Sequence, residues 1–418
     1  MFRGSLKWWR RKCSKRSLRK CLPMTDSIRF PLGSTLTLDS LSIDPYPHYR
    51  LLLDREPVTW VPEVNLWYVT RRDDVVAVLD NMDAFTVQSP HSLLDDTFGT
   101  MMLSTEGELH QRMRSPFAGA YVPKAVRASS SAFIEQKANE LIDSFIADKE
   151  TDLVKSFSDP MALYAVAASL GVPIVDFPQL RHWYDDFAAA LSNFRHDPAV
   201  RERGQRTAKE FGAQLAEHIA RLRVEPDDSL LSHLIHDPNT NLSKREIISN
   251  IFVIIFGGLE TTAAMFSNTV WALLNHPDQF DEVKRDPAKL MKSAVEETLR
   301  WESPVQTATR HVTQPITVRG VDFAVGDTVQ CMLGAANRDP EFFTEPDRFD
   351  IHRANASHHL AFARGRHHCL GASLARLEGE IGLRVLFERL PHLHLKSTHP
   401  SAPRGHEFRS VPKLIVEW

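Results

Sequence analysis

The sequence predicts a mainly α-helical protein with a small β region. Helical periodicity extends over much of residues 126–234. A capping box, Ser243-Lys244-Arg245-Glu246, begins a further helix that continues to about His276. The stretches rich in β-branched and aromatic residues are short and lie between turn residues, as in short strands. A long capped helix, a long helical region and only short strand-like stretches together favour this fold class.

The long helix from Ser243 covers about 33 residues and would span ~50 Å at 1.5 Å per residue. Pro277 stops it, and its apolar middle indicates that it is buried. Within residues 126–234, five prolines mark breaks near helix ends. In chain order, the sequence predicts strands at 58–60 and 66–69, the helical region, the long helix, a helix at 287–301, strands at 316–319 and 328–333, an irregular stretch to about 366, and a last helix at 371–390.

Composition restricts the class of protein. With 43% apolar and 25% charged residues the chain is ordinary for a globular protein, and residues 24–418 contain no Pro/Gly/Ser-rich linker, so we expect one domain there. The most apolar stretch, residues 251–256, is too short for a bilayer, so we expect no integral membrane span. Four cysteines cannot staple 418 residues, which excludes a disulfide scaffold and favours a reducing, cytoplasmic location.

Charge is distributed unevenly. Residues 1–23 carry nine Lys/Arg and no acid, whereas the remainder carries a net charge of −12. An acidic body argues against nucleic acid as a partner, because phosphate binding needs a basic face. The tail lacks the apolar region of a secretory signal. We interpret it as a disordered extension, or as the result of a start placed before Met24; a surface-binding arm and an organelle presequence are the alternatives.

Cys369 stands directly before the last predicted helix, in the segment Phe362-Ala363-Arg364-Gly365-Arg366-His367-His368-Cys369-Leu370-Gly371. A thiol at a helix N-terminus faces unpaired N–H groups and the positive end of the helix dipole, which favour the thiolate. Gly365 and Gly371 let the backbone approach a flat group. A buried free thiol in a turn is the usual alternative for a lone cysteine. Zinc fits poorly, because adjacent His368 and Cys369 cannot easily occupy two corners of one tetrahedron.

This segment resembles the haem-binding loop of the cytochrome P450 superfamily, Phe-Gly-x-Gly-x-[His/Arg]-x-Cys-x-Gly, with Ala363 in place of the first glycine. The resemblance covers essentially residues 30–418 and is greatest to the soluble bacterial branch, which lacks a membrane anchor. It implies the P450 fold, with a long central helix over the haem and the cysteine loop before the last long helix. It also implies haem b (heme b), with Cys369 as the axial thiolate that favours O–O cleavage, and with Phe362 and Gly371 among the cofactor contacts.

The long helix contains Gly257-Gly258-Leu259-Glu260-Thr261-Thr262, which resembles the family's oxygen-binding groove. Glycines inside a helix cost about 1 kcal/mol each relative to alanine, so two in succession indicate a specific need. Gly257 and Thr261 share one helix face, where a notch would admit O2. The resemblance implies that Thr261 orients water, Glu260 relays protons and Gly258 contacts the cofactor. A close helix-packing site with a solvated Glu260 is the alternative.

Four basic residues match family positions that bind the haem propionates. His110 and Arg114 fit a His-x-x-x-Arg pattern on one helix face, Arg310 follows Glu302-Ser303-Pro304-Val305, and His367 lies two residues before the cysteine. Buried carboxylates need charged partners, which such a set would supply. Taken singly, each is more often a surface base.

A structural network is predicted from Glu297-Thr298-Leu299-Arg300, whose acid and base share a helix face. An ordinary surface pair is the default interpretation of such a match. However, Pro346-Asp347-Arg348-Phe349 resembles the second half of the family's network. We therefore expect Glu297, Arg300 and Arg348 to form a buried triad that braces the cysteine loop.

The resemblance implies a monooxygenase, acting as a monomer, that inserts one atom of O2 into a small apolar organic substrate by hydroxylation or epoxidation. Electrons would come from NAD(P)H through a separate reductase and a ferredoxin or flavodoxin. Arg112, Arg364 and Arg366 are the predicted docking residues on the proximal face. The alternatives are a peroxygenase, an oxidative-coupling enzyme or a haem-based binding protein of the same fold. An apolar substrate pocket is expected from Phe98, Phe187, Leu191, Phe194, Ile254 and Val305.

The tail interpretation is testable by starting the chain at Met24. Nine like charges without a periodic apolar face cannot join a packed core, so the shortened protein should keep its haem content and thermal midpoint. Haem loss or a markedly lower midpoint would make the tail part of the fold. Normal folding with weaker binding to anionic vesicles at low salt would support the surface arm instead.

Overall fold

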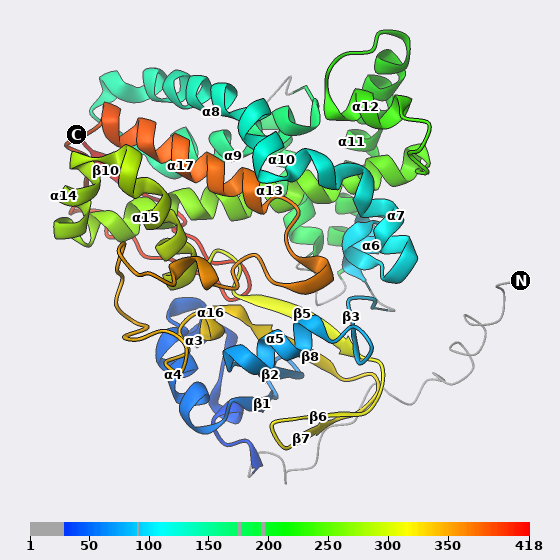
Figure 1. Ribbon diagram of the computed structural model, residues 1–418, viewed down its shortest axis with the longest axis vertical. Helices are drawn as coiled ribbons and strands as arrows, with labels where there is room; N and C mark the ends of the chain where they lie inside the picture. The colour runs from blue at the N-terminus through cyan, green and yellow to red at the C-terminus, as the bar shows by residue number, and fades with distance from the viewer. Residues whose placement is uncertain (1–28, 90–91, 174–176, 192, 194–196) are drawn as a thin grey trace, which may run out of the picture.

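The computed structural model describes residues 29–89, 92–173, 177–191, 193 and 197–418, so the basic tail lies outside the described residues. Helices form most of the described chain, and the strands form small sheets, which confirms the predicted class (Figure 1). The α-helices are α3 (Leu38–Ile43), α4 (Tyr46–Arg55), α5 (Arg72–Asp80), α6 (Leu93–Phe98), α7 (Gly107–Ala118), α8 (Pro123–Phe145), α9 (Asp159–Leu170), α10 (Phe177–Leu191), α11 (Pro198–Val224), α12 (Leu230–His236), α13 (Lys244–Leu274), α14 (Pro277–Arg285), α15 (Pro287–Trp301), α16 (Leu333–Ala336) and α17 (Ala372–Arg389).

The largest sheet has the strand order β1-β2-β8-β5-β3. Strands β2 and β8 pair in parallel, and the other neighbours pair antiparallel. In Figure 1 this sheet, with α4 and α5, lies below a layer of long helices, and the chain between α16 and α17 runs between the two parts. The strands are β1 (Val58–Val61), β2 (Leu66–Val69), β3 (Phe85–Thr86), β4 (Glu150–Asp152), β5 (Thr307–Val312), β6 (Ile316–Val318), β7 (Val321–Phe323), β8 (Thr328–Met332), β9 (His394–Leu395) and β10 (Ile415–Glu417).

Helix α13 is the predicted long central helix. Ser243 accepts from the backbone N–H of Glu246, whose carboxylate accepts from the N–H of Ser243 (2.8 Å), so the predicted capping box is present. The helix extends over 31 residues to Leu274. It is long and apolar enough to cross a membrane, but 67% of its most apolar window is buried inside the protein, as in a core helix. Its C-terminal half packs with α8, α15 and α17 in the largest apolar core.

Several elements were not expected from the sequence. The predicted helical region is interrupted by β4 and by a π-helical turn at Val154–Ser158. Helix α14 separates α13 from α15, and β5 and the C-terminal strand pair were also missed. These elements are short, and periodicity over a few residues does not separate a short strand or helix from a loop.

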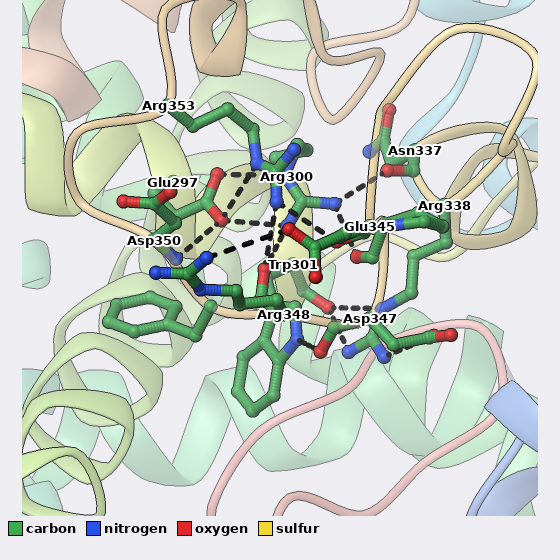
Figure 2. Close-up of polar contacts among 12 residues, drawn as sticks. Glu297, Arg300, Trp301, Asn337, Arg338, Glu345, Asp347, Arg348, Asp350 and Arg353 are labelled. Carbon is green, nitrogen blue, oxygen red and sulfur yellow. Dashed lines mark hydrogen bonds and ion pairs between the residues drawn. The ribbon is translucent and has the colours of Figure 1, made fainter.

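A buried ion network joins α15 to the chain that follows α16 (Figure 2). Glu297 and Arg300 have no exposed side-chain surface, and two hydrogen bonds of 2.7 Å join guanidinium and carboxylate. The remaining N–H groups of Arg300 donate to the backbone carbonyls of Asn337, Pro346 and Arg348. Because every group is paired, the buried charges are compensated.

The third side chain of this network is Arg353, so the expectation of Arg348 was wrong. Arg353 is nearly buried and donates from Nε to Glu297 Oε1 at 3.2 Å. The side chain of Arg348 is 62% exposed and pairs at 3.5 Å with Glu345, which is also exposed. Only the backbone carbonyl of Arg348 enters the network. The turn that offers this carbonyl directs the side chain to solvent.

The two arginines make a matched test of this assignment. Arg353→Met should lower the free energy of unfolding by about 3 kcal/mol, because removing one partner leaves a buried carboxylate undercompensated. Arg348→Met should change it by less than about 0.5 kcal/mol, since an exposed pair contributes little. Urea denaturation of both variants measures the difference. Equal losses, or a larger loss for Arg348→Met, would contradict the assignment.

Candidate active site

The cysteine loop is closed by backbone hydrogen bonds. The N–H of Cys369 donates to the carbonyl of Phe362 at 3.0 Å, and a 3-10 turn at Gly365–His367 lies inside the loop. Cys369 is exposed, whereas Cys331 is buried. The exposed thiol favours a binding role for Cys369 over a buried structural thiol.

Two residues of the loop have left-handed backbone conformations. Ala363 has φ = 52°, a region that costs an L-residue about 1–2 kcal/mol and that the glycine of the family pattern would occupy freely. Gly365 has φ = 73°, and a Cβ there would lie 2.9 Å from the carbonyl oxygen of Leu79 on α5. The glycine therefore allows the loop to pack against α5.

The electrostatic surroundings of Cys369 act in both directions. Although Cys369 is exposed, the protein atoms around its sulfur disfavour the charged form and raise the pKa of the thiol, while the backbone N–H of Gly371 and the cations of Arg114 and Arg376 lower it, with a net rise. The helix N-terminus therefore does not by itself lower the pKa of Cys369, and a bound metal ion would favour the thiolate.

A second ion network supports the loop, and sequence reasoning missed it. Arg376 lies over the ring of Phe362, with its guanidinium carbon 4.4 Å from the ring centroid, and donates from Nε to Glu296 at 2.6 Å. His359 Nδ1 accepts from the N–H of Ala361, so its Nε2 donates to Glu296 at 3.1 Å. Burial alone would raise the pKa of Glu296, but the bonds from His359 and Arg376 hold it at about 2.

The predicted basic residues converge beside the loop. The rings of His110 and His367 have centroids 4.4 Å apart, and both side chains are buried. His367 Nε2 lies 3.2 Å from the carboxylate of Glu106. Arg310 is buried and donates to the carbonyl of Thr309, and Arg114 donates to the carbonyl of His368 at 2.6 Å. The structure thus brings His110, Arg114, Arg310 and His367 to the neighbourhood of Cys369.

Two nitrogens of this cluster lack partners. His110 Nε2 and Arg310 Nε are buried and make no hydrogen bond within the described residues. Burial, followed by the charges of His367 and Arg114, lowers the pKa of His110 to about 4, so the ring is neutral. An unpartnered buried polar group costs about 1–3 kcal/mol, more when charged. A buried guanidinium nitrogen and a buried imidazole nitrogen, both unpartnered, fit an anionic group such as a carboxylate.

Helix α13 leaves open space beside Gly257 but not beside Gly258. A Cβ on Gly257 would meet no atom within 4 Å, and the hydroxyl of Thr261 donates to the carbonyl of Gly257 at 2.6 Å. A Cβ on Gly258 would lie 2.7 Å from Val166 on α9, so the small size of Gly258 is needed for helix packing. The carboxylate of Glu260 accepts a hydrogen bond from the hydroxyl of Tyr184 on α10.

Aromatic side chains from α6, α10, α11 and α13 form an apolar cluster on the N-terminal half of α13. Phe98 lies 5.1 Å from both Phe187 and Phe252, measured between ring centroids, and Tyr184 stacks on Phe256. A small cavity is lined by Tyr184, Phe187, Phe252 and Phe256 of this region, with Leu163 and Leu259. Of the predicted pocket residues, Phe98 and Phe187 belong to this cluster, and Ile254 packs against it. Val305 instead lies beside the sheet core, while Phe194 and the side chain of Leu191 lie outside the described residues.

The predicted docking residues are partly engaged in ion pairs. Arg112 binds Glu246 of the α13 capping box at 2.5 Å, and Arg364 binds Asp80 at 2.7 Å while remaining half exposed. Arg366 is exposed. For the zinc alternative, within the described part of the chain no group of three or more His, Cys, Asp and Glu side chains is arranged to hold a metal.

Comparisons with known proteins agree with this geometry. The family model for cytochrome P450 matches residues 200–413. The biotin biosynthesis cytochrome P450 of Bacillus subtilis is 34% identical over 84% of this chain and 89% of its own length. The cytochrome P450 monooxygenase PikC of Streptomyces venezuelae is 34% identical, over 84% and 85%. The crystal structure of P450BioI in complex with hexadec-9Z-enoic acid ligated acyl carrier protein superposes with a TM-score of 0.84, at 31% identity, covering 92% of this chain and 100% of that one.

These relatives align over most of the chain, and the solved structure has the same overall fold. The chain therefore belongs to the cytochrome P450 family and is a monooxygenase of the bacterial type.

Proposed function

We propose that this monooxygenase binds haem b between the cysteine loop and α13, with Cys369 as the iron ligand. The observation that carries the proposal is the pair of buried, unpartnered nitrogens, His110 Nε2 and Arg310 Nε, beside an exposed thiol. A haem presents two carboxylates, which can pair with the Arg310 guanidinium and hydrogen-bond to His110, and an iron ion, which a cysteine sulfur can bind. When bound, the haem-thiolate supplies the activation of O2, from which one atom enters the substrate and the other leaves as water.

In this proposal His110, Arg114, Arg310 and His367 hold the propionates. Phe362 and Gly371 contact the macrocycle from the cysteine side, and Gly258 contributes backbone from the α13 side. Phe362 is itself fixed by the guanidinium of Arg376 above its ring. A cofactor contact fixed by its neighbours loses little freedom when the haem binds.

On the α13 side of the proposed site, Thr261 and Glu260 would deliver protons. The hydroxyl of Thr261 lies beside the open notch at Gly257, where it would hold and orient a water. Glu260, the residue before Thr261 on the helix, would pass a proton to that water and take one back from the solvent side. This acid–alcohol pair favours the O2-dependent monooxygenase over a peroxygenase, an oxidative-coupling enzyme or a haem-based binding protein.

We assign a small apolar organic substrate to the space bordered by the aromatic cluster of Phe98, Phe187, Phe252 and Phe256. The electrons would come from a ferredoxin or flavodoxin and an NAD(P)H-dependent reductase. Arg364 and Arg366 are exposed near the cysteine loop and would contact such an acidic partner. With these partners we place the enzyme in the cytoplasm, as a monomer.

Cys369→Ser tests the assignment of the iron ligand. A serine hydroxyl is a far weaker donor than a thiolate, so the reduced carbon-monoxide difference spectrum should lose its thiolate band. Cys331→Ser is the matched control, because Cys331 is a buried free cysteine on β8. A thiolate band that persists in Cys369→Ser would disprove the assignment.

Thr261→Ala tests the proton role. The notch remains but the hydroxyl that positions water is lost, so haem binding should be normal while product formed per NAD(P)H oxidised falls severalfold and peroxide release rises. Thr269→Ala is the control, since Thr269 makes the same kind of bond, to the carbonyl of Met265, two turns along α13. Unchanged coupling in Thr261→Ala would count against the role.

A further inference from the structure

The carboxylate of Glu260 is held by a side chain that the acid–alcohol pair does not include. The hydroxyl of Tyr184 donates to Glu260 Oε2, and the ring of Tyr184 stacks on Phe256 one turn before Glu260, with ring centroids 5.4 Å apart and an interplanar angle of 18°. Tyr184 is only 7% exposed. Its ring is thus held by stacking, with its hydroxyl in reach of the Glu260 carboxylate.

Two ion pairs of Arg181 fix the same turn of α10. Arg181, three residues before Tyr184, pairs with Asp159 at the start of α9 and with Asp185 at 3.1 Å. Its guanidinium carbon lies 5.5 Å from the centroid of the Tyr184 ring. Four polar side chains therefore lie where helices α9, α10 and α13 meet. The Arg181 guanidinium pairs with Asp159, and the Tyr184 hydroxyl donates to Glu260.

The charges at this meeting point explain why Tyr184 serves as a donor. Burial first, and then the carboxylate of Glu260, raise the pKa of Tyr184, so the phenol stays protonated. Burial raises the pKa of Asp159 to about 6 even though Arg181 lowers it, and the carboxylates of Asp152, Asp185 and Glu260 add to the rise. A partly buried carboxylate needs hydrogen-bond donors, and the hydroxyl of Tyr184 meets this need at Glu260.

We propose that Tyr184 is a positioning residue for proton delivery: its hydroxyl orients the Glu260 carboxylate, and it does so from the same helix that contributes Phe187 to the aromatic cluster. This inference rests on the proposed role of Glu260. Tyr184 neither gives up nor accepts a proton. Glu260 passes its proton toward the water at Thr261 and regains one from the solvent side, so the proton count balances without Tyr184.

The test compares Tyr184→Phe, Glu260→Gln and the double variant as holoenzymes with a surrogate ferredoxin and reductase. The substrate is the member of a steroid, fatty-acid, terpene and macrolide panel that gives the largest Soret shift. Tyr184→Phe should lower coupled turnover about threefold to tenfold, the loss expected for one ordinary hydrogen bond. It should also raise the solvent isotope effect. The double variant should be no slower than Glu260→Gln, because both changes act through one carboxylate.

A second readout does not depend on turnover. The shifts in the urea midpoint of the two single variants should fail to add in the double variant, since the two side chains contact each other. Glu260→Asp retains the charge but withdraws the carboxylate by one methylene, so it should reproduce the slower turnover of Tyr184→Phe. Glu260→Asp therefore replaces Tyr184→Phe as the test if Tyr184→Phe folds poorly.

Tyr46→Phe is the matched control. This change also deletes a tyrosine hydroxyl that donates to a carboxylate. Tyr46 lies on α4, and its hydroxyl donates to Glu302 Oε1 at 2.9 Å. Tyr46→Phe should leave turnover and the isotope effect unchanged. If Glu260→Gln is impaired while Tyr184→Phe turns over normally and the midpoint shifts add, the inference is wrong and the role of Glu260 stands. If Glu260→Gln is itself unimpaired, the proposed role of Glu260 fails, and the inference fails with it.

Discussion

Two adjacent carboxylates on α15 hold the chain that carries Cys369. Glu297 accepts from Arg300 and Arg353, while Glu296 accepts from His359 and Arg376. A buried carboxylate is costly unless its oxygens are fully bonded, so each acid fixes its donors in place. Most of these donors lie in or next to the chain between α16 and α17. That chain has few helices or strands, and its conformation depends on these side-chain bonds in place of a regular ladder.

The site follows from this arrangement because its two halves come from different elements. The cysteine loop is held against α5 and α15 by Gly365 and by the Glu296 network, and α13 is held by its capping box and by the close contact of Gly258 with Val166. The basic side chains of α7 and β5 lie beside the loop and keep two buried nitrogens unpartnered. Leaving these two buried nitrogens without hydrogen bonds destabilises the folded protein, and an anionic cofactor that accepts from them would remove this destabilisation.

Local signals in the sequence were sufficient for some of these features and insufficient for others. The start of α13 was predictable because a capping box joins residues only three apart, and the cysteine loop was recognised by its resemblance to the family's haem-binding loop, whose residues are contiguous in the sequence. The choice between Arg348 and Arg353 was not, because it depends on the path of an irregular stretch. The partners of Glu296 lie 63 and 80 residues away, and Tyr184 lies 76 residues from Glu260, so no spacing rule connects them. The pairing of Arg112 with the capping-box residue Glu246, 134 residues away, is likewise non-local and was not predicted.

The central claim is that the loop presents the sulfur of Cys369 to a haem iron. X-ray absorption at the iron edge of the purified holoprotein tests it most directly, because the first coordination shell reports the ligand atom itself. A sulfur scatterer should be present in the wild-type protein and absent from Cys369→Ser. A first shell of nitrogen and oxygen alone in the wild-type protein would contradict the account.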